Sequence, residues 1–188
     1  MGISPSNKSF IHPDFLLETE AAKRLYHEFA KDLPILDYHN HLSPKAISEN
    51  TIFNSVTQLW LEGDHYKWRA LRTLGVDEKY ITGTATDKEK FVHYASSVPF
   101  MIRNPLYHWT HLELKRYFGI SELLSKNNAS ALYEQTNAMA TSAYFSTQDV
   151  LEKMNVERIC TSNDTRDKLE KNKTFATGNH KMQMNTAF

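Results

Sequence analysis

The spacing of apolar residues predicts a helix near the start of the chain and a strand soon after it. From Asp14 onward, apolar residues recur every four positions, which is the spacing of one face of an amphipathic helix. These residues are Leu17, Ala21, Leu25 and Phe29. Residues 35–39 (ILDYH) follow Pro34 and have the pattern of a short buried strand. We therefore expect a helix and then a strand.

Residues 44–154 carry almost no strand signal and instead repeat the signals that begin helices. Pro44 and Pro105 each follow a capping residue, where the first turn of a helix accepts proline. Thr86 and Glu89 have the spacing of a capping box. The predicted N-caps are Ser43, Ser55, Asp64, Thr86, Asn104 and Ser146. This stretch is therefore predicted to be a long helical insertion.

Two further strands are predicted after the helical stretch. Residues 156–160 (VERIC) follow its last helix, and residues 180–184 (HKMQM) are a weaker candidate. A charged segment, residues 165–173, lies between them and can form one helix. Strands separated by helices favour a parallel sheet and the α/β fold class. Three strands are few for such a sheet, which needs cover on both faces, so the sequence looks interrupted.

These patterns divide the chain into four parts. The parts are a flexible N-terminal arm (residues 1–13), a first helix and strand (14–43), the helical insertion (44–154), and a second and third strand (155–188).

The composition argues against several classes of partner. The 22 basic and 22 acidic residues cancel, so the chain lacks the basic excess typical of proteins that bind nucleic acid. No apolar run approaches the roughly 20 residues that a membrane-spanning helix needs. The one cysteine excludes an internal disulfide and a CxxC metal site, and favours a cytoplasmic location. We therefore expect neither nucleic acid nor a membrane as a partner.

The strongest sign of chemistry is the sequence DYHNH at residues 37–41. Alternate residues of a strand point to the same side, so His39 and His41 can place two imidazoles about 7 Å apart along one face. Neutral imidazoles are good ligands for Zn²⁺ and similar divalent ions. The alternative is a pair of ordinary loop histidines. A catalytic zinc also needs a third protein ligand, which no fixed spacing in this sequence identifies.

A second cluster, GDHYKWR at residues 63–69, places an imidazole, a phenol and two cations at the start of a predicted helix. The free N–H groups of a helix start can bind an anion such as a substrate carboxylate. The alternative is an exposed, capped helix with Trp68 in the core.

A third cluster, NPLYHWTHLEL at residues 104–114, contains two histidines on one helix face, His108 and His111. They could form a metal pair, but the HExxH spacing of zinc proteases is absent. We favour a structural interpretation, in which the aromatic side chains, Trp109 among them, lie inside and the histidines form hydrogen bonds.

Together, these segments resemble the uronate isomerases, an outlying branch of the metal-dependent amidohydrolase superfamily. The similarity runs in order from Phe15 to about Asp164, and the GDHYKWR and NPLYHWTHLEL segments are far more selective than HxH alone. The resemblance implies the start of a distorted (β/α)₈ barrel with a helical insertion after its first strand. It also implies the interconversion of D-glucuronate with D-fructuronate and of D-galacturonate with D-tagaturonate, with a hexuronate as the small-molecule substrate.

The resemblance also implies roles for four residues. His39 and His41 correspond to the metal-binding pair of the family, so a divalent metal ion, Zn²⁺ before others, is the expected cofactor. His65 and Tyr66 correspond to residues that line the substrate site. Tyr66 is the expected catalytic residue, through proton transfer. A tyrosine phenol acts as a base only where a metal ion or a cation stabilises its phenolate.

The sequence departs from the family pattern near its end. Thr165 stands where the family usually has proline, Asn172 or its neighbour replaces a histidine, and Thr186 replaces another proline. Further metal and substrate residues of the family would follow Phe188. We therefore expect the beginning of a barrel that stops before it closes, with an incomplete site and little or no activity by itself.

Two other functions remain open. The first is hydrolysis by a metal-dependent enzyme of the same superfamily, since HxH on a first strand serves both reactions. The second is a non-catalytic binding or assembly role, because the unpaired edge of an unfinished sheet can pair with another chain, including a second copy in a homo-oligomer.

Overall fold

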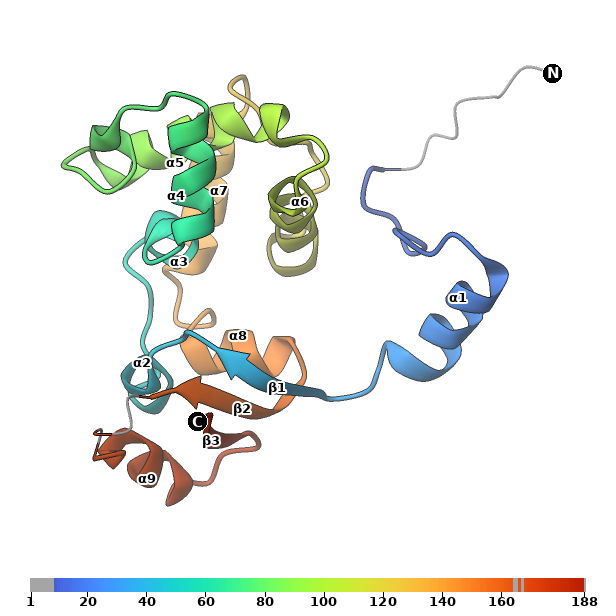
Figure 1. Cartoon of the computed structure of the whole chain (residues 1–188), viewed down its shortest axis with the longest axis vertical. Helices are drawn as coiled ribbons and strands as arrows, with labels where there is room; N and C mark the ends of the chain where they lie inside the picture. The colour runs from blue at the N-terminus through green and yellow to red at the C-terminus, as the bar shows by residue number, and fades with distance from the viewer. Residues whose placement is uncertain (1–8, 164–165, 167, 188) are drawn as a thin grey trace. The chain divides into compact units, whose positions relative to one another are not determined.

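The computed structural model describes residues 9–163, 166 and 168–187 (Figure 1). The chain forms two compact units, and each is considered by itself. A helical unit contains the residues up to Lys23 together with Asn54–Met139, and a sheet unit contains Arg24–Phe53 and the residues from Ala140 onward. The chain therefore leaves the sheet unit after Phe53 and returns to it at Ala140.

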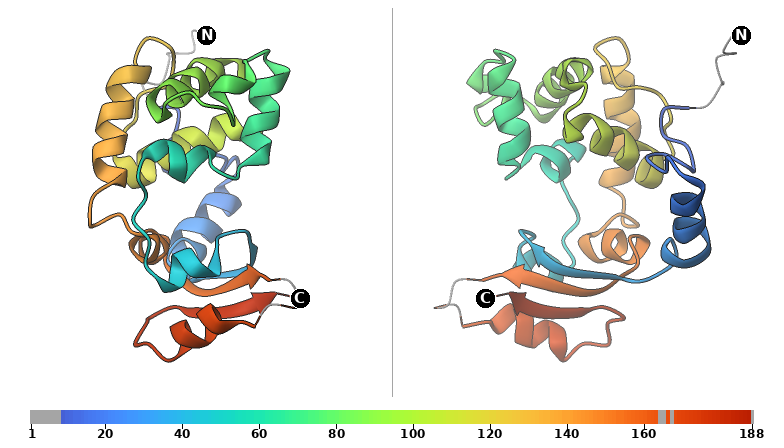
Figure 2. Two further views of the ribbon diagram at one scale, coloured as in Figure 1. Left: turned by 90° about the vertical axis from the view of Figure 1, so that its left-hand side faces the viewer. Right: turned by 45° about the vertical axis from the view of Figure 1, so that its right-hand side comes forward.

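The sheet unit contains a three-stranded parallel sheet in the order β1-β2-β3 (Figures 1 and 2). The strands are β1 (Ile35–Asn40), β2 (Val156–Ser162) and β3 (Gln183–Ala187). The register between β2 and β3 is regular, whereas the register between β1 and β2 shifts twice, once just after Ile35 and once between Asp37 and Asn40. The predicted α/β class with a parallel sheet is confirmed, although β3 begins at Gln183, three residues after its predicted start. The prediction that the first strand is buried is wrong, because Leu36 and Tyr38 are 60% and 84% exposed.

Three short helices share one hydrophobic cluster with the sheet. They are α2 (Pro44–Ser48), α8 (Thr147–Lys153) and α9 (Glu170–Ala176). Each contributes one buried apolar side chain, and Ile159 of β2 is 1% exposed at the centre of the cluster. The three side chains are Ile47, Leu151 and Phe175. This packing explains why α2 and α8 belong to the sheet unit, whereas the sequence analysis assigned both to an insertion spanning residues 44–154.

The two segments that lead into and out of the helical unit are joined inside the sheet unit. Ile52 and Ser146 form an isolated antiparallel bridge, and the backbone N–H of Thr147 donates to the carbonyl of Thr51 over 2.9 Å. The Thr147 hydroxyl donates to the same carbonyl. The departing and returning chain segments therefore lie side by side.

The helical unit is built around buried aromatic rings. Trp60 stacks on Phe91 with ring centroids 5.8 Å apart, and Phe91 and Tyr94 are both fully buried. The helices are α3 (Val56–Leu61), α4 (His65–Thr73), α5 (Asp87–Ser97), α6 (Pro105–Phe118) and α7 (Ala129–Ala140), with the 3₁₀ turns η2 (Glu78–Tyr80) and η3 (Val98–Met101). None of the described helices has the length and apolarity needed to cross a membrane.

Side-chain caps begin most of the helices, as the sequence predicts. Thr86 and Glu89 form the expected capping box, and Gly119 ends α6 with a φ of 69°, a conformation that glycine adopts without strain. Capping hydrogen bonds are also present at Ser55, Asp64, Asn104 and Ser146. Of the six predicted caps, Ser43 is the exception, because its side chain makes no capping bond.

The first helix differs from its prediction. It begins only at Glu20, as α1 (Glu20–Leu25), and continues as a π-helical turn, η1 (Tyr26–Ala30). Leu25 and Phe29 are 63% and 60% exposed. No element of the described part of the chain covers this face, so these side chains remain exposed. The prediction of a buried face is therefore wrong here.

The predicted flexible arm also needs correction over its described part, residues 9–13. The Phe10 ring lies 5.1 Å from Tyr107 and 5.6 Å from His111, and Ile11 is buried. Lys115 donates to the carbonyl of Ile11 over 2.5 Å. An apolar and aromatic segment therefore packs against α6, which the polar average of the N-terminal residues did not reveal.

Replacing Ile159 with alanine should lower the free energy of unfolding by about 2–5 kcal/mol, because it opens a cavity where α2, α8 and α9 meet the sheet. Urea denaturation of the purified chain measures the change. Glu157→Ala, at an exposed position of the same strand, is the matched control and should shift stability by no more than about 0.5 kcal/mol. Equal losses in the two variants would contradict this description of the core.

Candidate functional site

The two histidines of the DYHNH motif come together at the carboxyl end of β1. Their Nε2 atoms are 3.2 Å apart, and the ring centroids are 5.1 Å apart. Both side chains are exposed. The alternation of strand residues thus correctly predicted that His39 and His41 point to the same side, and their rings converge more closely than the backbone spacing alone suggests.

Asn40, between the two histidines, fixes the end of the strand. Its Nδ2 donates to the carbonyl of Cys160 over 2.9 Å, and its Oδ1 accepts the backbone N–H of Leu42 over 3.0 Å. The Ser162 hydroxyl donates to the Asn40 carbonyl over 2.8 Å. These bonds tie the motif to β2 through Asn40, while the two imidazoles face each other.

The spacing of the two Nε2 atoms fits a shared divalent ion. Two nitrogens bound to one tetrahedral Zn²⁺ at about 2.0–2.1 Å lie roughly 3.4 Å apart, close to the observed 3.2 Å. A complete zinc site also needs a third protein ligand. Among the described residues, no group of three or more His, Cys, Asp or Glu side chains is placed to hold a metal ion. His39 and His41 therefore have the spacing of two metal ligands, with no third ligand beside them among the described residues.

His65 and Tyr66 lie in the first turn of α4. Asp64 caps this helix, since its Oδ1 accepts the backbone N–H groups of Tyr66 and Lys67, each over 3.0 Å. The rings of His65 and Tyr66 contact each other with centroids 4.4 Å apart, and Tyr66 is 61% exposed. The capped, exposed helix start agrees with the structural interpretation of this cluster, except that Trp68 is only partly buried and Lys67 is the buried residue. Both His65 and Tyr66 are exposed.

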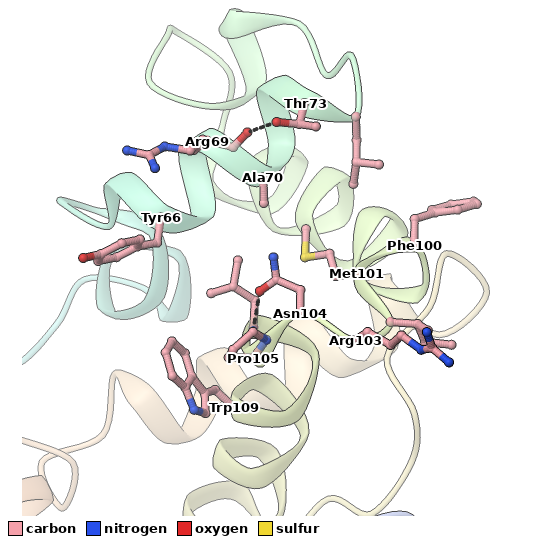
Figure 3. Close-up of a pocket in the computed structure, with 13 residues that line it drawn as sticks. Tyr66, Arg69, Ala70, Thr73, Phe100, Met101, Arg103, Asn104, Pro105 and Trp109 are labelled. Carbon is pink, nitrogen blue, oxygen red and sulfur yellow. Dashed lines mark hydrogen bonds between the residues drawn. The ribbon is translucent and has the colours of Figure 1, made fainter.

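A groove of about 680 Å³ lies beside Tyr66 in the helical unit. Figure 3 shows Tyr66, Arg69 and Trp109 on one side of it, and Phe100 and Arg103 on the other. Two arginines and no carboxylate line the groove. Trp109 is 52% exposed, so the prediction that it lies inside is wrong. The helical spacing did not reveal the groove, because it forms between α4 and the start of α6.

The histidines of the third cluster do not form a metal pair. His111 is buried, and its Nε2 accepts the backbone N–H of Leu124 over 2.9 Å. Its Nδ1 then carries the proton and donates to the carbonyl of Tyr107 over 2.7 Å. Burial lowers the pKa of His111, although the bond to Tyr107 opposes that shift. Because both ring nitrogens are occupied, the structural interpretation of this cluster holds for His111.

The family model described as "Glucuronate isomerase" matches residues 7–188, nearly the whole chain. The chain belongs to the glucuronate isomerase family. This assignment confirms the resemblance seen in the HxH, GDHYKWR and NPLYHWTHLEL segments.

Two curated relatives illustrate the similarity. The uronate isomerase of Flavobacterium johnsoniae is 51% identical over 183 residues, which are 97% of this chain and 39% of that protein. The uronate isomerase of Bacillus subtilis is 52% identical over 161 residues, which are 86% of this chain and 34% of that protein. The chain therefore spans well under half the length of these relatives.

Solved structures agree with the sequence comparison. The crystal structure of uronate isomerase from Thermotoga maritima matches with a TM-score of 0.87 and 37% identity, covering 93% of this chain and 38% of that one. Glucuronate isomerase from Caulobacter crescentus matches with a TM-score of 0.78 at 24% identity, which shows a common fold.

The stability of the helical unit should depend on pH through His111. Its pKa is lowered in the folded state, so the unfolded chain binds a proton more readily. The contribution of His111 to the free energy of unfolding is fully present above the ordinary histidine pKa of about 6.5 and is lost as the pH falls toward the folded pKa. Over that range, the free energy of unfolding changes by at most about 1.4 kcal/mol per pH unit.

Urea denaturation between pH 5 and pH 8 tests this dependence. His111→Gln should be less stable at pH 8 and should lack the component of the slope that His111 supplies. His108→Gln, one helical turn away, is the control and should keep that component. An unchanged slope in His111→Gln would show that another group is responsible.

Proposed function

We propose that this chain forms part of a uronate isomerase that interconverts D-glucuronate with D-fructuronate, and D-galacturonate with D-tagaturonate. The observation that carries the proposal is the pair of converging imidazoles at the end of the first parallel strand, in a chain of the glucuronate isomerase family. In this proposal, β1, β2 and β3 are strands of a (β/α)₈ barrel. Barrel enzymes keep their active sites at the carboxyl ends of such strands, where His39 and His41 lie.

The proposed cofactor is a divalent metal ion, with Zn²⁺ preferred. The Nε2 atoms of His39 and His41 would hold it, and their spacing supports this role. A bound ion would polarise the oxygens of the substrate and stabilise developing negative charge. The third ligand would come from residues outside those that the structure describes, since the described residues offer no third group beside the pair.

His65 and Tyr66 are proposed to bind the hexuronate, with Tyr66 in proton transfer. Isomerisation moves a proton between C1 and C2 and needs a base, a donor and a group that stabilises oxyanion charge. The Tyr66 phenol is exposed and makes no hydrogen bond within the described part of the chain, so it is available to a substrate hydroxyl. His65, in contact with its ring, adds a donor or acceptor for a second substrate oxygen.

The competing functions have less support. A hydrolase of the same superfamily would share the HxH pair, but the family match favours isomerisation over it. The cytoplasmic location and the homo-oligomer that the sequence suggested stay predictions.

Binding of Zn²⁺ to the purified chain tests the metal pair. We expect one ion per chain, held weakly because two ligands are fewer than a full site requires, and an affinity about tenfold or more lower in His39→Ala and in His41→Ala. Isothermal titration calorimetry measures both affinities. His180→Ala, whose ring stacks on Phe175 within the sheet unit, is the matched control and should bind like the unaltered chain. Equal Zn²⁺ affinity in the unaltered chain and in all three variants would show that His39 and His41 are not metal ligands.

A chimera tests the isomerase activity. Residues 7–188 of this chain would replace the matched part of the Bacillus subtilis relative, and ketose formation from D-glucuronate would be followed with added Zn²⁺. The chimera should turn over, whereas Tyr66→Phe and His39→Ala within it should lose about a hundredfold or more of that activity. The chain by itself should form little or no ketose. A folded chimera without activity would contradict the proposed function, and enzyme-like turnover by the chain alone would contradict the incomplete site.

A further inference from the structure

The start of α4 contains a buried cation. Lys67 is 7% exposed, and its Nζ donates to the carbonyl of Trp60 over 2.9 Å. The same Nζ is 3.3 Å from Asp64 Oδ2 and lies 5.7 Å from the ring centroid of Trp60 and 5.8 Å from that of Tyr94. A charge withdrawn from water is costly unless it is paired and hydrogen-bonded, and Lys67 has both kinds of partner.

The partners of Lys67 connect two helix ends. The carbonyl of Trp60 is one of the last in α3, where acceptors have no partner inside the helix and a cation is favourable. Asp64, the other partner, caps α4 through its second carboxylate oxygen. Trp68 adds a parallel link, because its Nε1 donates to the carbonyl of Leu61 over 2.7 Å. The first turn of α4 is therefore fastened to the end of α3.

The residues of the GDHYKW segment fall into two groups: those that hold the helix start in place and those whose side chains are exposed. Gly63 makes the turn with a φ of 78°, and Asp64, Lys67 and Trp68 make the bonds described above. His65 and Tyr66 stand between these supporting residues. Their side chains are exposed and contact each other, and they make no hydrogen bond to any described residue.

Two carboxyl groups and a tyrosine ring surround Lys67. Asp64 precedes α4, and Glu113 of α6 faces the same interior. Burial raises the pKa of Glu113, while Lys67 acts to lower it. Tyr94 of α5 contributes a ring face and a hydroxyl bonded to Thr110 over 2.6 Å. Lys67 thus pairs with Asp64 and acts electrostatically on the carboxyl group of Glu113 as well.

We infer that Lys67 is a positioning residue: it fixes the direction in which His65 and Tyr66 leave the helix start, without touching the substrate itself. The inference deepens the proposed function, on which the substrate role of those two side chains rests. Lys67 acts through the Asp64 cap and the Trp60 carbonyl, so its loss should loosen the first turn of α4 and leave the rest of the helix in place.

Backbone amide hydrogen exchange of the full chain, followed by NMR, tests this inference. In Lys67→Met, which keeps an apolar stem and removes the charge, the amides of residues 66 and 67 should exchange about tenfold faster or more. The amides of Leu71 and Phe91 should keep their protection. Arg72→Met removes a cation that pairs with Glu78 at the other end of α4, and it should leave residues 66 and 67 unchanged. Unchanged exchange at these two amides in Lys67→Met, or equally faster exchange throughout the helical unit, would overturn the inference.

Asp64→Asn covers the case in which Lys67→Met does not fold. Asparagine caps helices as well as aspartate does, so this variant removes the ion pair and keeps the cap. Faster exchange confined to residues 66 and 67 supports the inference, and unchanged exchange overturns it.

A second test titrates D-glucuronate into the unaltered chain and into Lys67→Met and follows the NMR signal of the Tyr66 amide. A general loss of stability does not change how much ligand this signal requires. The shift of the Tyr66 amide should require about tenfold more ligand in the variant. Equal titration curves would count against positioning. If the unaltered chain shows no shift at Tyr66, the proposed substrate role has failed, while the exchange measurement still decides the role of Lys67.

Discussion

The parallel pairing of β1 with β2 is the interaction on which the candidate metal pair depends. Backbone hydrogen bonds between the two strands and the side-chain bonds of Asn40 hold the end of β1 in one register. A slip of one residue would turn every side chain of the strand to the opposite face and would carry both imidazoles with it, away from their present side of the sheet. The register shift between Asp37 and Asn40 falls within the DYHNH motif. The backbone irregularity at this point therefore also affects the positions of the two imidazoles.

The proposed substrate residues depend on a different kind of support. His65 and Tyr66 belong to a helix start whose backbone is capped by one carboxylate, and that carboxylate is held in turn by a buried lysine. An exposed side chain gains a defined direction only from the rigidity of its backbone, because it has few packing contacts of its own. The two pairs are thus supported in contrasting ways, one by sheet pairing and the other by a buried ion pair.

The sequence predicted the features that arise from neighbouring residues. Thr86 with Glu89, and Ser55 with its capping bond, are local signals whose partners lie within four positions. The same-side placement of His39 and His41 follows from strand alternation in the same way. The GDHYKWR and NPLYHWTHLEL segments carried the family assignment.

Other features depend on contacts between distant parts of the chain, and the sequence did not reveal them. Leu25 and Trp109 fit a helical pattern but remain exposed, because no described element covers them as the pattern suggested. The groove beside Tyr66 and the buried partners of Lys67 arise where α4 meets other helices. Sequence spacing names no third ligand for the proposed metal ion, since ligands from separate strands meet only in the folded chain.

The bridge between Ile52 and Ser146 has a consequence for how this family can vary. Because the bridge holds the two ends of the excursion Asn54–Met139 next to each other, the sheet unit itself fixes where this excursion begins and ends. Closing a loop across a fixed gap costs entropy that grows only slowly with its length. Residues can therefore be gained or lost in the excursion with little effect on the sheet, so long as its two ends still meet at this bridge.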